Sequence, residues 1–523
     1  MTAARAARGR GSAAWPAIAL ALAALGALGL LIADEALGAR ADSPDEVVEV
    51  DAVDRGVRYC PVTAGEEESA TLVLAAGPEA TEATVVRYGQ AGPERGEPHD
   101  LAAGEQRDVT LDGGEAGDPV AVEWRGGPVA ASWHVEGERD AGAPCPTVPA
   151  PTWHLAGMDT ALGAETTLHL FNPFSVDAVV RVRFGTPEGR VDLLRTDNVV
   201  VPAGGTEVVD LVDVQPEEPE LGVTVETLAG RVIAGGELDR TRLDEDDDEG
   251  PQGRTLVPAV AEPGQRWHLP SAIVGEAWES DVVVYNPGER EAAVTVSTSD
   301  PLGDVARAEH AVPPGGTTRL PLTDLAEPDA FAVVVETVTE VPVVVVRHEG
   351  FLDADQPGYT VQPGLPAAST WVVPRGPGDR AELVAMHNAG GDPVDVDVTI
   401  GGESVEGWTG ETLAPNDRAT LDLGELEPAG GPVLITADGE ISATLISNLA
   451  DGNDFGRILG LAVPITADAD VPHEPMPVRH DPPLATEPIR PPGRDPDEGP
   501  TEPDEELDLP DLDEDGDASG EDG

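Results

Sequence analysis

The sequence predicts an all-β fold: a tandem array of about four immunoglobulin-like β-sandwich modules, placed after one N-terminal transmembrane helix and before a disordered acidic tail. Short segments rich in Val and Thr alternate in polarity and are separated by Gly, Pro and Asn, which is typical of strands joined by turns. Landmarks recur about every 100 residues, the size of an immunoglobulin-like sandwich of roughly seven strands. A β-propeller is the alternative, and it would need two blades in each repeat.

The repeat is visible in its opening residues and in the turns that follow the next strand. The opening aromatic residues are Tyr59, Trp153, Trp267 and Trp371, and the turn residues are Asn172, Asn286 and Asn388. The last three opening residues are 114 and 104 residues apart. We therefore expect modules at 57–150, 151–262, 263–367 and 368–466.

The N-terminus has the pattern of an export segment. Residues 1–12 carry three arginines and no acid, and residues 13–33 carry no charge. About 20 apolar residues cross a bilayer as a helix, and basic residues before the helix orient the rest of the chain outward. We expect a single-pass cell-membrane protein with a linker at 34–56 and most of the chain outside. Cleavage at Ala39-Arg40-Ala41 would give a secreted protein instead.

The chain has two cysteines, Cys60 and Cys145, near the two ends of the first module. In an oxidising compartment they are expected to form a disulfide, and two free buried thiols are the alternative. The bond would close a loop of about 86 residues, worth roughly 4–5 kcal/mol in the chain-entropy account. Because there is no C-x-x-C motif, a redox-catalytic role has no support.

The C-terminal segment 467–523 loses the strand pattern and fills with Pro, Asp and Glu, so we expect it to be disordered. It contains the spacing of an EF-hand loop, at Asp511, Asp513, Asp515, Gly516, Asp517 and Asp522. Asp522 stands where that loop has a bidentate Glu. Acid-rich sequence produces such matches by chance, so the spacing does not establish calcium binding.

The charge balance excludes one class of partner. The chain has 99 acidic and 31 basic residues, for a formal net charge of −68. A nucleic-acid binder needs a basic surface, so nucleic acid is not an expected partner. The acidic excess favours solubility and suits high salt, and a surface made for a cationic partner is the alternative. A polytopic membrane protein is excluded because no second long apolar run occurs.

The histidines give no catalytic pattern. His154 and His268 follow the repeated tryptophans, but Cys60 and Val372 take this place in the other repeats. A catalytic or ligand role would not be expected in two repeats and missing from the other two. We expect strand positions with one exposed face. The sequence has no G-x-S-x-G elbow, no phosphate-binding Gly loop and no paired His/Cys ligand set, so we predict no catalytic residue, cofactor or metal site.

The tryptophans fall into two groups. The three that recur at the repeat openings are expected to pack in the core of each module. Four others are not repeated and are the better candidates for a surface that stacks on sugar rings: Trp124, Trp133, Trp278 and Trp408. Burial is still the more common environment of a single tryptophan.

The apolar N-terminal segment, the Cys60-Pro61 opening and the Asn-Pro turns that lead into Val-rich strands together carry a resemblance. The chain resembles the exported actinobacterial proteins grouped as domain-of-unknown-function family 5719, over most of 57–466. The modules also resemble bacterial immunoglobulin-like sandwich repeats, which serve as adhesion or enzyme-accessory units. The resemblance implies an envelope location and a repeat build, and it supplies no catalytic residue.

Together these features predict a non-catalytic scaffold or binding protein outside the membrane, anchored through one N-terminal helix. A cell-wall polymer or an envelope protein is the expected partner. One alternative is carbohydrate binding through the unrepeated tryptophans. The other is an exported hydrolase whose Ser or Asp and His meet only in the fold, between modules.

Overall fold

The computed structural model describes residues 55–464 except for short gaps at 66–67, 112, 138, 147–148, 242–250, 301–304, 328, 352–357, 378–379, 425, 427–429, 450–456 and 459–462. The predicted segments 1–12 and 13–33 and the acidic tail 467–523, with its EF-hand-like spacing, lie outside the described residues. Within the described part of the chain, no helix is long and apolar enough to cross a membrane. The first described strand begins at Arg55, inside the predicted linker.

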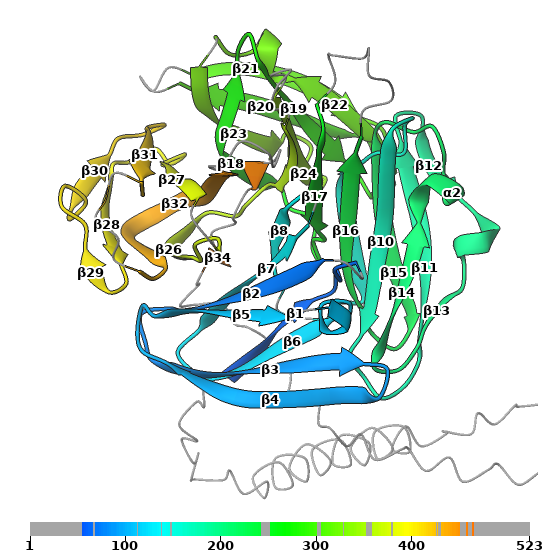
Figure 1. Cartoon of the computed structure of the whole chain (residues 1–523). Helices are drawn as coiled ribbons and strands as arrows, with labels where there is room; N and C mark the ends of the chain where they lie inside the picture. Colours follow the sequence, from blue (N-terminus) through cyan, green and yellow to red (C-terminus); the bar gives the residue numbers. More distant parts are fainter. Residues whose placement is uncertain are drawn as a thin grey trace, which may run out of the picture. The chain divides into compact units, whose positions relative to one another are not determined.

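The regular secondary structure of the described residues is almost entirely strands, which fall into four consecutive groups that we call repeats 1 to 4 (Figure 1). Repeat 1 contains β1 (Arg55–Cys60), β2 (Ser69–Ala76), β3 (Thr81–Gly89), β4 (Gly92–Leu101), β5 (Gln106–Leu111), η1 (Gly113–Glu115), β6 (Val120–Gly126), β7 (Val129–Glu136) and β8 (Ala141–Pro144). Repeat 2 contains β9 (Thr152–Met158), β10 (Ala164–Asn172), β11 (Ala178–Thr186), β12 (Gly189–Asp192), η2 (Leu194–Thr196), β13 (Val199–Val201), β14 (Gly205–Asp210), α2 (Leu211–Val214), β15 (Leu221–Ala229), β16 (Ile233–Arg240) and β17 (Gly253–Pro258).

Repeats 3 and 4 follow the same plan. Repeat 3 contains β18 (Arg266–Val274), β19 (Trp278–Tyr285), β20 (Ala292–Ser299), β21 (Val305–Val312), β22 (Thr317–Pro321), η3 (Leu322–Asp324), β23 (Asp329–Thr337), β24 (Val344–Phe351) and β25 (Gly358–Pro363). Repeat 4 contains β26 (Ala368–Val373), β27 (Arg380–His387), β28 (Val394–Ile400), β29 (Glu403–Ser404), β30 (Glu411–Leu413), β31 (Arg418–Asp422), β32 (Val433–Leu449), β33 (Arg457–Ile458) and β34 (Val463–Pro464).

Every repeat has the same sheet topology. If its strands are lettered a to h in chain order, one sheet has the order a-f-c-d and the other e-b-g-h, and all pairs are antiparallel. In repeat 2, β12 and β13 share position d; in repeat 4, β29 and β30 share it, and β32 supplies both f and g. The two sheets of each repeat share apolar side chains, so each pair packs face to face as a sandwich.

The strand order differs from that of an immunoglobulin domain at two positions. An immunoglobulin sheet places its first strand beside the second and its seventh beside the sixth. Here strand a pairs with f, and g pairs with b. With g beside b, strand h extends this sheet, so each sheet has at least four strands. The immunoglobulin-like order therefore holds for the inner pairs b–e and c–f and fails for a and g.

The segment after strand h returns to cover the free edge of strand a. The backbone contacts are Tyr59 with Pro146, His154 with Val260, His268 with Leu365, and Val372 with Val463. An uncovered strand edge is a site for unwanted pairing with another chain. The return therefore protects one sheet edge in all four repeats.

A hydrogen bond ties strand a to strand g in every repeat, through a buried tryptophan indole in three of them. The donor–acceptor pairs are Trp153 Nε1 to Val232 O (2.8 Å), Trp267 Nε1 to Val343 O (2.8 Å) and Trp371 Nε1 to Ile441 O (3.1 Å). These tryptophans lie in the cores, as predicted. In repeat 1 the equivalent bond comes from Arg58 Nε to Val129 O, at 2.8 Å. The predicted alignment of Tyr59 with the tryptophans is therefore wrong by one residue.

In each repeated Asn turn, the asparagine side chain holds the backbone through hydrogen bonds, and we call this arrangement an Asn lock. Each of these asparagines is fully buried and donates through Nδ2 to a carbonyl four residues later and to one at the end of strand d. Each also accepts at Oδ1 from the backbone N–H two residues later. The residues are Asn172, Asn286 and Asn388, and their first acceptors are Val176 (2.8 Å), Arg290 (2.7 Å) and Asp392 (2.9 Å). Ala76 occupies this place in repeat 1, by its position at the end of strand b.

Consecutive repeats pack head to tail. The outer face of sheet e-b-g-h in one repeat covers the outer face of strands a and f in the preceding repeat. The residue before the Asn position lies in this contact: Phe171 meets Tyr59 of repeat 1, and Tyr285 meets Thr224 of repeat 2. In repeat 4 it is His387 on β27, a strand that packs against β18 of repeat 3, where His268 lies close enough to affect the pKa of His387.

The fourth contact of this kind closes the series. Ala75 of repeat 1, at the same strand position, packs with Val372 of repeat 4. The turn between strands d and e of repeat 1 also contacts repeat 4. A Cβ on Gly104 in this turn would lie 2.9 Å from the backbone N of Gly402, which lies in the c–d turn of repeat 4. A head-to-tail interface that returns to its first unit is a closed one. The predicted tandem array is therefore closed, since repeat 1 contacts repeat 4.

Candidate functional site

The polar side chains of the described residues gather where the repeats meet. Strand alternation leaves one face of each sheet toward its own sandwich and the other toward a neighbouring repeat. Six histidines lie 7% exposed or less on these outer faces: His134, His154, His169, His268, His348 and His387. We call the four interfaces seams and name each by the repeats that it joins.

Seam 1–2 combines an aromatic contact with a buried ion network. Phe171 lies between Tyr59 and Tyr88, with ring centroids 6.3 and 4.9 Å away. Arg254 bridges Glu68 of repeat 1 and Glu237 of repeat 2, both at 2.5 Å. Burial raises the pKa of Glu237, but hydrogen bonds from His169 and the charge of Arg254 outweigh it, so the pKa lies below its ordinary value.

Seam 2–3 holds a histidine whose protonation state is fixed by its neighbours. His348 Nδ1 lies 2.6 Å from Arg319 Nη2 and 2.6 Å from the Tyr359 hydroxyl. Arg319 can only donate, so Nδ1 must accept and the ring proton must be on Nε2. Burial, followed by the charges of Arg319 and Arg240, lowers the pKa of His348 well below its usual range. The imidazole is therefore a neutral acceptor in this seam.

The same seam contains a second neutral histidine. His154 Nδ1 lies 2.9 Å from the Thr224 hydroxyl, and that hydroxyl is 2.7 Å from the Tyr285 hydroxyl of repeat 3. Burial lowers the pKa of His154 to about 4. Gly185 and Gly222 make room for the Tyr285 ring, because a Cβ on either would lie 2.4 Å from it.

Seam 3–4 is polar and has few direct bonds between side chains. Arg418 of repeat 4 donates from Nε to the Pro270 carbonyl at 3.0 Å, and the Gln362 side chain donates to the Thr444 hydroxyl at 2.6 Å. His387 is fully buried, and neither ring nitrogen has a hydrogen-bond partner among the described residues. A buried polar group without a partner is costly.

In seam 4–1, a side-chain amide takes the place of a peptide group in a pair of hydrogen bonds. The Gln106 amide of repeat 1 donates to the Arg375 carbonyl at 3.0 Å and accepts from the Arg375 backbone N–H at 2.9 Å. The apolar part of this seam is small, with Ala75, Ala130 and Val372 as its buried members.

The predicted exposure of the paired histidines is wrong. His154 and His268 are 7% and 4% exposed, because a neighbouring repeat covers the face that an isolated module would leave in water. Among the unrepeated tryptophans, Trp133 is 2% exposed and lies in the core of repeat 1. The other three, Trp124, Trp278 and Trp408, are half-buried against core or aromatic neighbours.

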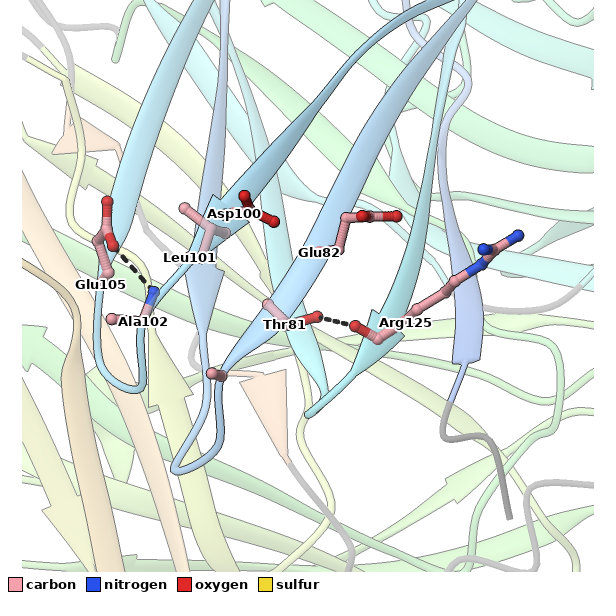
Figure 2. Close-up of a pocket in the computed structure, with 8 residues that line it drawn as sticks. Thr81, Glu82, Asp100, Leu101, Ala102, Glu105 and Arg125 are labelled. Atoms are coloured by element: carbon pink, nitrogen blue, oxygen red, sulfur yellow. Dashed lines mark hydrogen bonds between the residues drawn. The ribbon is translucent and has the colours of Figure 1, made fainter. Parts of the chain in front are cut away.

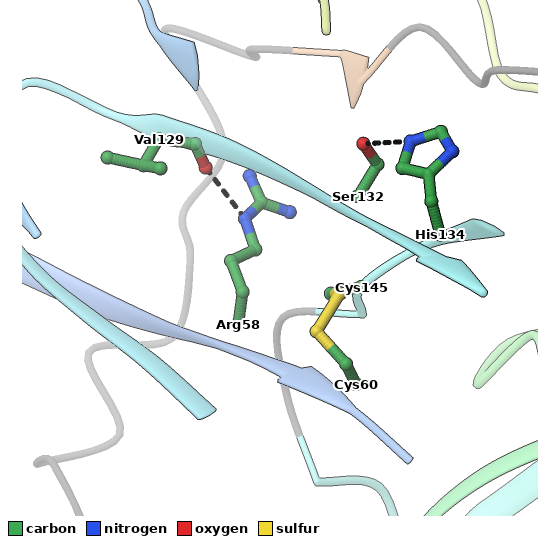
Figure 3. Close-up of a disulfide and its surroundings, with 6 residues drawn as sticks. All are labelled: Arg58, Cys60, Val129, Ser132, His134 and Cys145. Carbon is green, nitrogen blue, oxygen red and sulfur yellow. Dashed lines mark hydrogen bonds between the residues drawn. A yellow bond between two sulfur atoms is a disulfide. The ribbon is translucent and has the colours of Figure 1, made fainter. Parts of the chain in front are cut away.

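The two cysteines are joined in the core of repeat 1 (Figure 3). Cys60, the last residue of β1, forms a disulfide with Cys145, which directly follows β8. The bond therefore links strand a to the end of strand h, close to the Arg58–Val129 hydrogen bond.

One Ser–His pair corresponds to the chemistry of the hydrolase alternative. The Ser132 hydroxyl lies 3.0 Å from His134 Nε2, two residues along β7 (Figure 3). A serine nucleophile needs such a base, and it also needs access to the substrate carbonyl. The two residues are 4% and 3% exposed, which keeps the hydroxyl out of reach of a substrate in this conformation.

A depression of about 550 Å³ lies at one end of strands β3 and β4 (Figure 2). Its lining includes Glu82, Asp100, Glu105 and Arg125. Glu105 accepts from the Ala102 backbone N–H at 2.9 Å, so it is occupied in holding the turn. Within the described residues, no group of three or more His, Cys, Asp or Glu side chains is arranged to hold a metal ion.

Comparison with known proteins gives a family match over part of the chain. Among solved structures, a crystal structure of a tetra-tandem repeat in the extending region of a large adhesion protein matches with 10% identity, over 74% of this chain and 92% of that chain. Its TM-score of 0.09 is too low to carry an argument. No curated protein matches. Residues 140–356 match a family of unknown function, DUF5719. The matched stretch runs from β8 through β24, and over it the chain is similar to that family.

Proposed function

We propose that this protein is a non-catalytic scaffold of the cell envelope, exported and held at the membrane by residues 13–33. The observation that supports this proposal is the location of the side chains that could take part in catalysis. The buried histidines lie on faces that a neighbouring repeat covers, and Arg254 bridges Glu68 of repeat 1 and Glu237 of repeat 2. Groups held this way stabilise an arrangement, whereas a catalytic group needs contact with substrate.

The export half of the proposal rests on the N-terminal sequence and on the disulfide. The uncharged run 13–33 follows a basic segment, which orients the remaining chain outward. The Cys60–Cys145 disulfide suits an oxidising compartment.

Membrane attachment is tested by alkaline extraction of membranes from cells that make the full chain or a variant lacking 13–33. We expect the full chain in the membrane pellet and outside the cell by protease accessibility, and the variant in the cytoplasm. Full-chain protein found in the cytoplasm would contradict the proposal.

The scaffold role is tested by cross-linking on intact cells. We expect the full chain to be recovered with a reproducible envelope protein or wall polymer, and Ser132→Ala to leave this recovery unchanged. Loss of a hydrolytic activity in Ser132→Ala, with the fold intact, would favour the hydrolase alternative instead.

A further inference from the structure

Repeat 4 is attached to the rest of the protein in a different way from the other repeats. One apolar cluster joins the core of repeat 2 to facing side chains of repeats 1 and 3, and it includes Phe171 and Tyr285. The cores of repeats 1, 3 and 4 are separate clusters, and repeat 4 has a histidine, His387, where Phe171 and Tyr285 take part in the joined cluster. Repeat 4 contacts repeat 3 through polar side chains and repeat 1 through a small apolar patch.

Two histidines face each other across seam 3–4. His268 projects from β18 away from its own core, because its neighbours Trp267 and Leu269 point inward. His387 projects from β27 in the same way, since Met386 lies in the core of repeat 4. Phe171 and Tyr285 occupy the position of His387 in repeats 2 and 3.

The charged groups around this pair are cations. Arg266 lies on β18 beside His268, and Arg418 on β31 pairs in register with His387. Glu336 is opposite Arg266 on β23, but it is exposed. On β32 the residue opposite His387 is Ser442, which carries no charge. A proton added to either imidazole would place a positive charge among like charges, away from water.

We propose that seam 3–4 is an acid-labile joint, at which repeat 4 separates from repeat 3 with its own sandwich still folded. The direction follows from linkage. Burial lowers the pKa of His268 to about 4 and, together with His268, Arg418 and Arg266, lowers that of His387 to about 3. An opened seam would return both toward about 6.5, so the open form binds more protons and is favoured as the pH falls below that value.

Seam 2–3 has an opposing effect that is not found among the described residues of seam 3–4. Burial raises the pKa of Asp281 and of Glu220 there, so the closed seam takes up protons at these carboxyls as the pH falls. This uptake offsets the cost of protonating His154 and His348. Acid should therefore open seam 3–4 first. The inference does not depend on the scaffold role.

The test is hydroxyl-radical footprinting of the full chain between pH 8 and pH 4, with reactivity referred to the denatured chain at each pH. We expect the reactivity of His268 to rise below about pH 6, in step with His387, while Trp371 in the core of repeat 4 stays protected. Tyr285 in seam 2–3 should stay protected over the same range. No rise at His268, or a parallel rise at Trp371, would overturn the proposal.

The matched variant is His387→Phe, which installs the residue that repeat 2 has at this position. Two titrating histidines make opening about 100-fold more favourable per pH unit between the two sets of pKa values, and one makes it about 10-fold. His387→Phe should therefore lower the midpoint pH for His268 exposure and halve the steepness. His310→Phe, outside the seam on β21, should change neither. An unchanged midpoint and steepness in a folded His387→Phe would contradict the account.

Discussion

Repeats 1–3 and repeat 4 use the same head-to-tail placement but fill it with different chemistry. At the residue before the Asn position, repeats 2 and 3 have Phe171 and Tyr285, and repeat 4 has His387. The aromatic residues belong to the cluster that joins the core of repeat 2 to facing side chains of repeats 1 and 3, whereas His387 puts a polar side chain at the same place. One backbone arrangement can thus give a permanent joint or one that depends on conditions.

The largest expected effect is at a permanent joint. Phe171→Ala removes a fully buried ring between Tyr59 and Tyr88, and a buried Phe→Ala change costs about 3–5 kcal/mol of unfolding free energy. Guanidinium denaturation should show this loss in the transition of repeats 1–3. Leu162→Ala, at a residue 83% exposed, is the control and should stay within about 0.5 kcal/mol. A loss below about 1 kcal/mol in Phe171→Ala would mean that seam 1–2 is not packed as described.

The pH dependence of the labile joint comes next. Above about pH 6.5 the buried histidines are neutral in both forms and contribute no pH dependence. At pH 5.5 protonation of each of His268 and His387 favours the open form by about 1.4 kcal/mol, so the free energy that holds seam 3–4 closed should fall by about 3 kcal/mol. Denaturation of the full chain at pH 7.5 and 5.5, followed separately for repeat 4 and repeats 1–3, measures it. Greater acid sensitivity in repeats 1–3 would reverse the comparison.

Removal of an Asn lock should lower the free energy of unfolding by the same amount in repeats 1–3 and in repeat 4. Asn286→Ala and Asn388→Ala each leave buried carbonyls without a donor, which costs about 1–3 kcal/mol. Because the lock lies within a sandwich, the loss should appear at either pH and in the transition of the repeat that carries it. An effect of Asn388→Ala that appears only at acid pH would show that this lock belongs to the seam.

The smallest expected effect is at the closing seam. Gly104 and Gly204 occupy equivalent turns with φ of 69° and 64°, a conformation that Asn416 adopts in repeat 4 with φ of 63°. Gly104→Asn should cost about 1–2 kcal/mol because its Cβ meets Gly402, whereas Gly204→Asn has open space. Thermal denaturation of the two variants compares them directly. Equal losses of stability would show that the cost comes from the turn conformation alone, with no contact between Gly104 of repeat 1 and repeat 4.

The sequence was sufficient to predict the strands and the core within each repeat. The period of two, the recurring tryptophans and the Asn turns predict the strands and the sandwich cores, because these features depend on a repeat's own residues. Arg58 was missed as the counterpart of Trp153, since a guanidinium and an indole share only the N–H that both donate to a carbonyl.

The seams could not be predicted in the same way. His268 and His387 are 119 residues apart and follow no common spacing. A histidine on the outer face of a strand looks exposed until the neighbouring repeat is in place. The available clue was the substitution pattern at one position, Phe171, Tyr285 and His387, where large side chains recur on a face expected to meet water.

The central claim is that the repeats form a closed head-to-tail cycle, and cross-linking tests it most directly. Cysteines at Ala103 and Glu403, both exposed beside the Gly104–Gly402 contact, are joined with a short bismaleimide in the full chain. Ala203→Cys with Glu403→Cys, which uses the equivalent turn of repeat 2, is the matched control. The account predicts a cross-link within one molecule for the first pair and none for the second. Cross-links of the first pair found only between molecules would contradict closure.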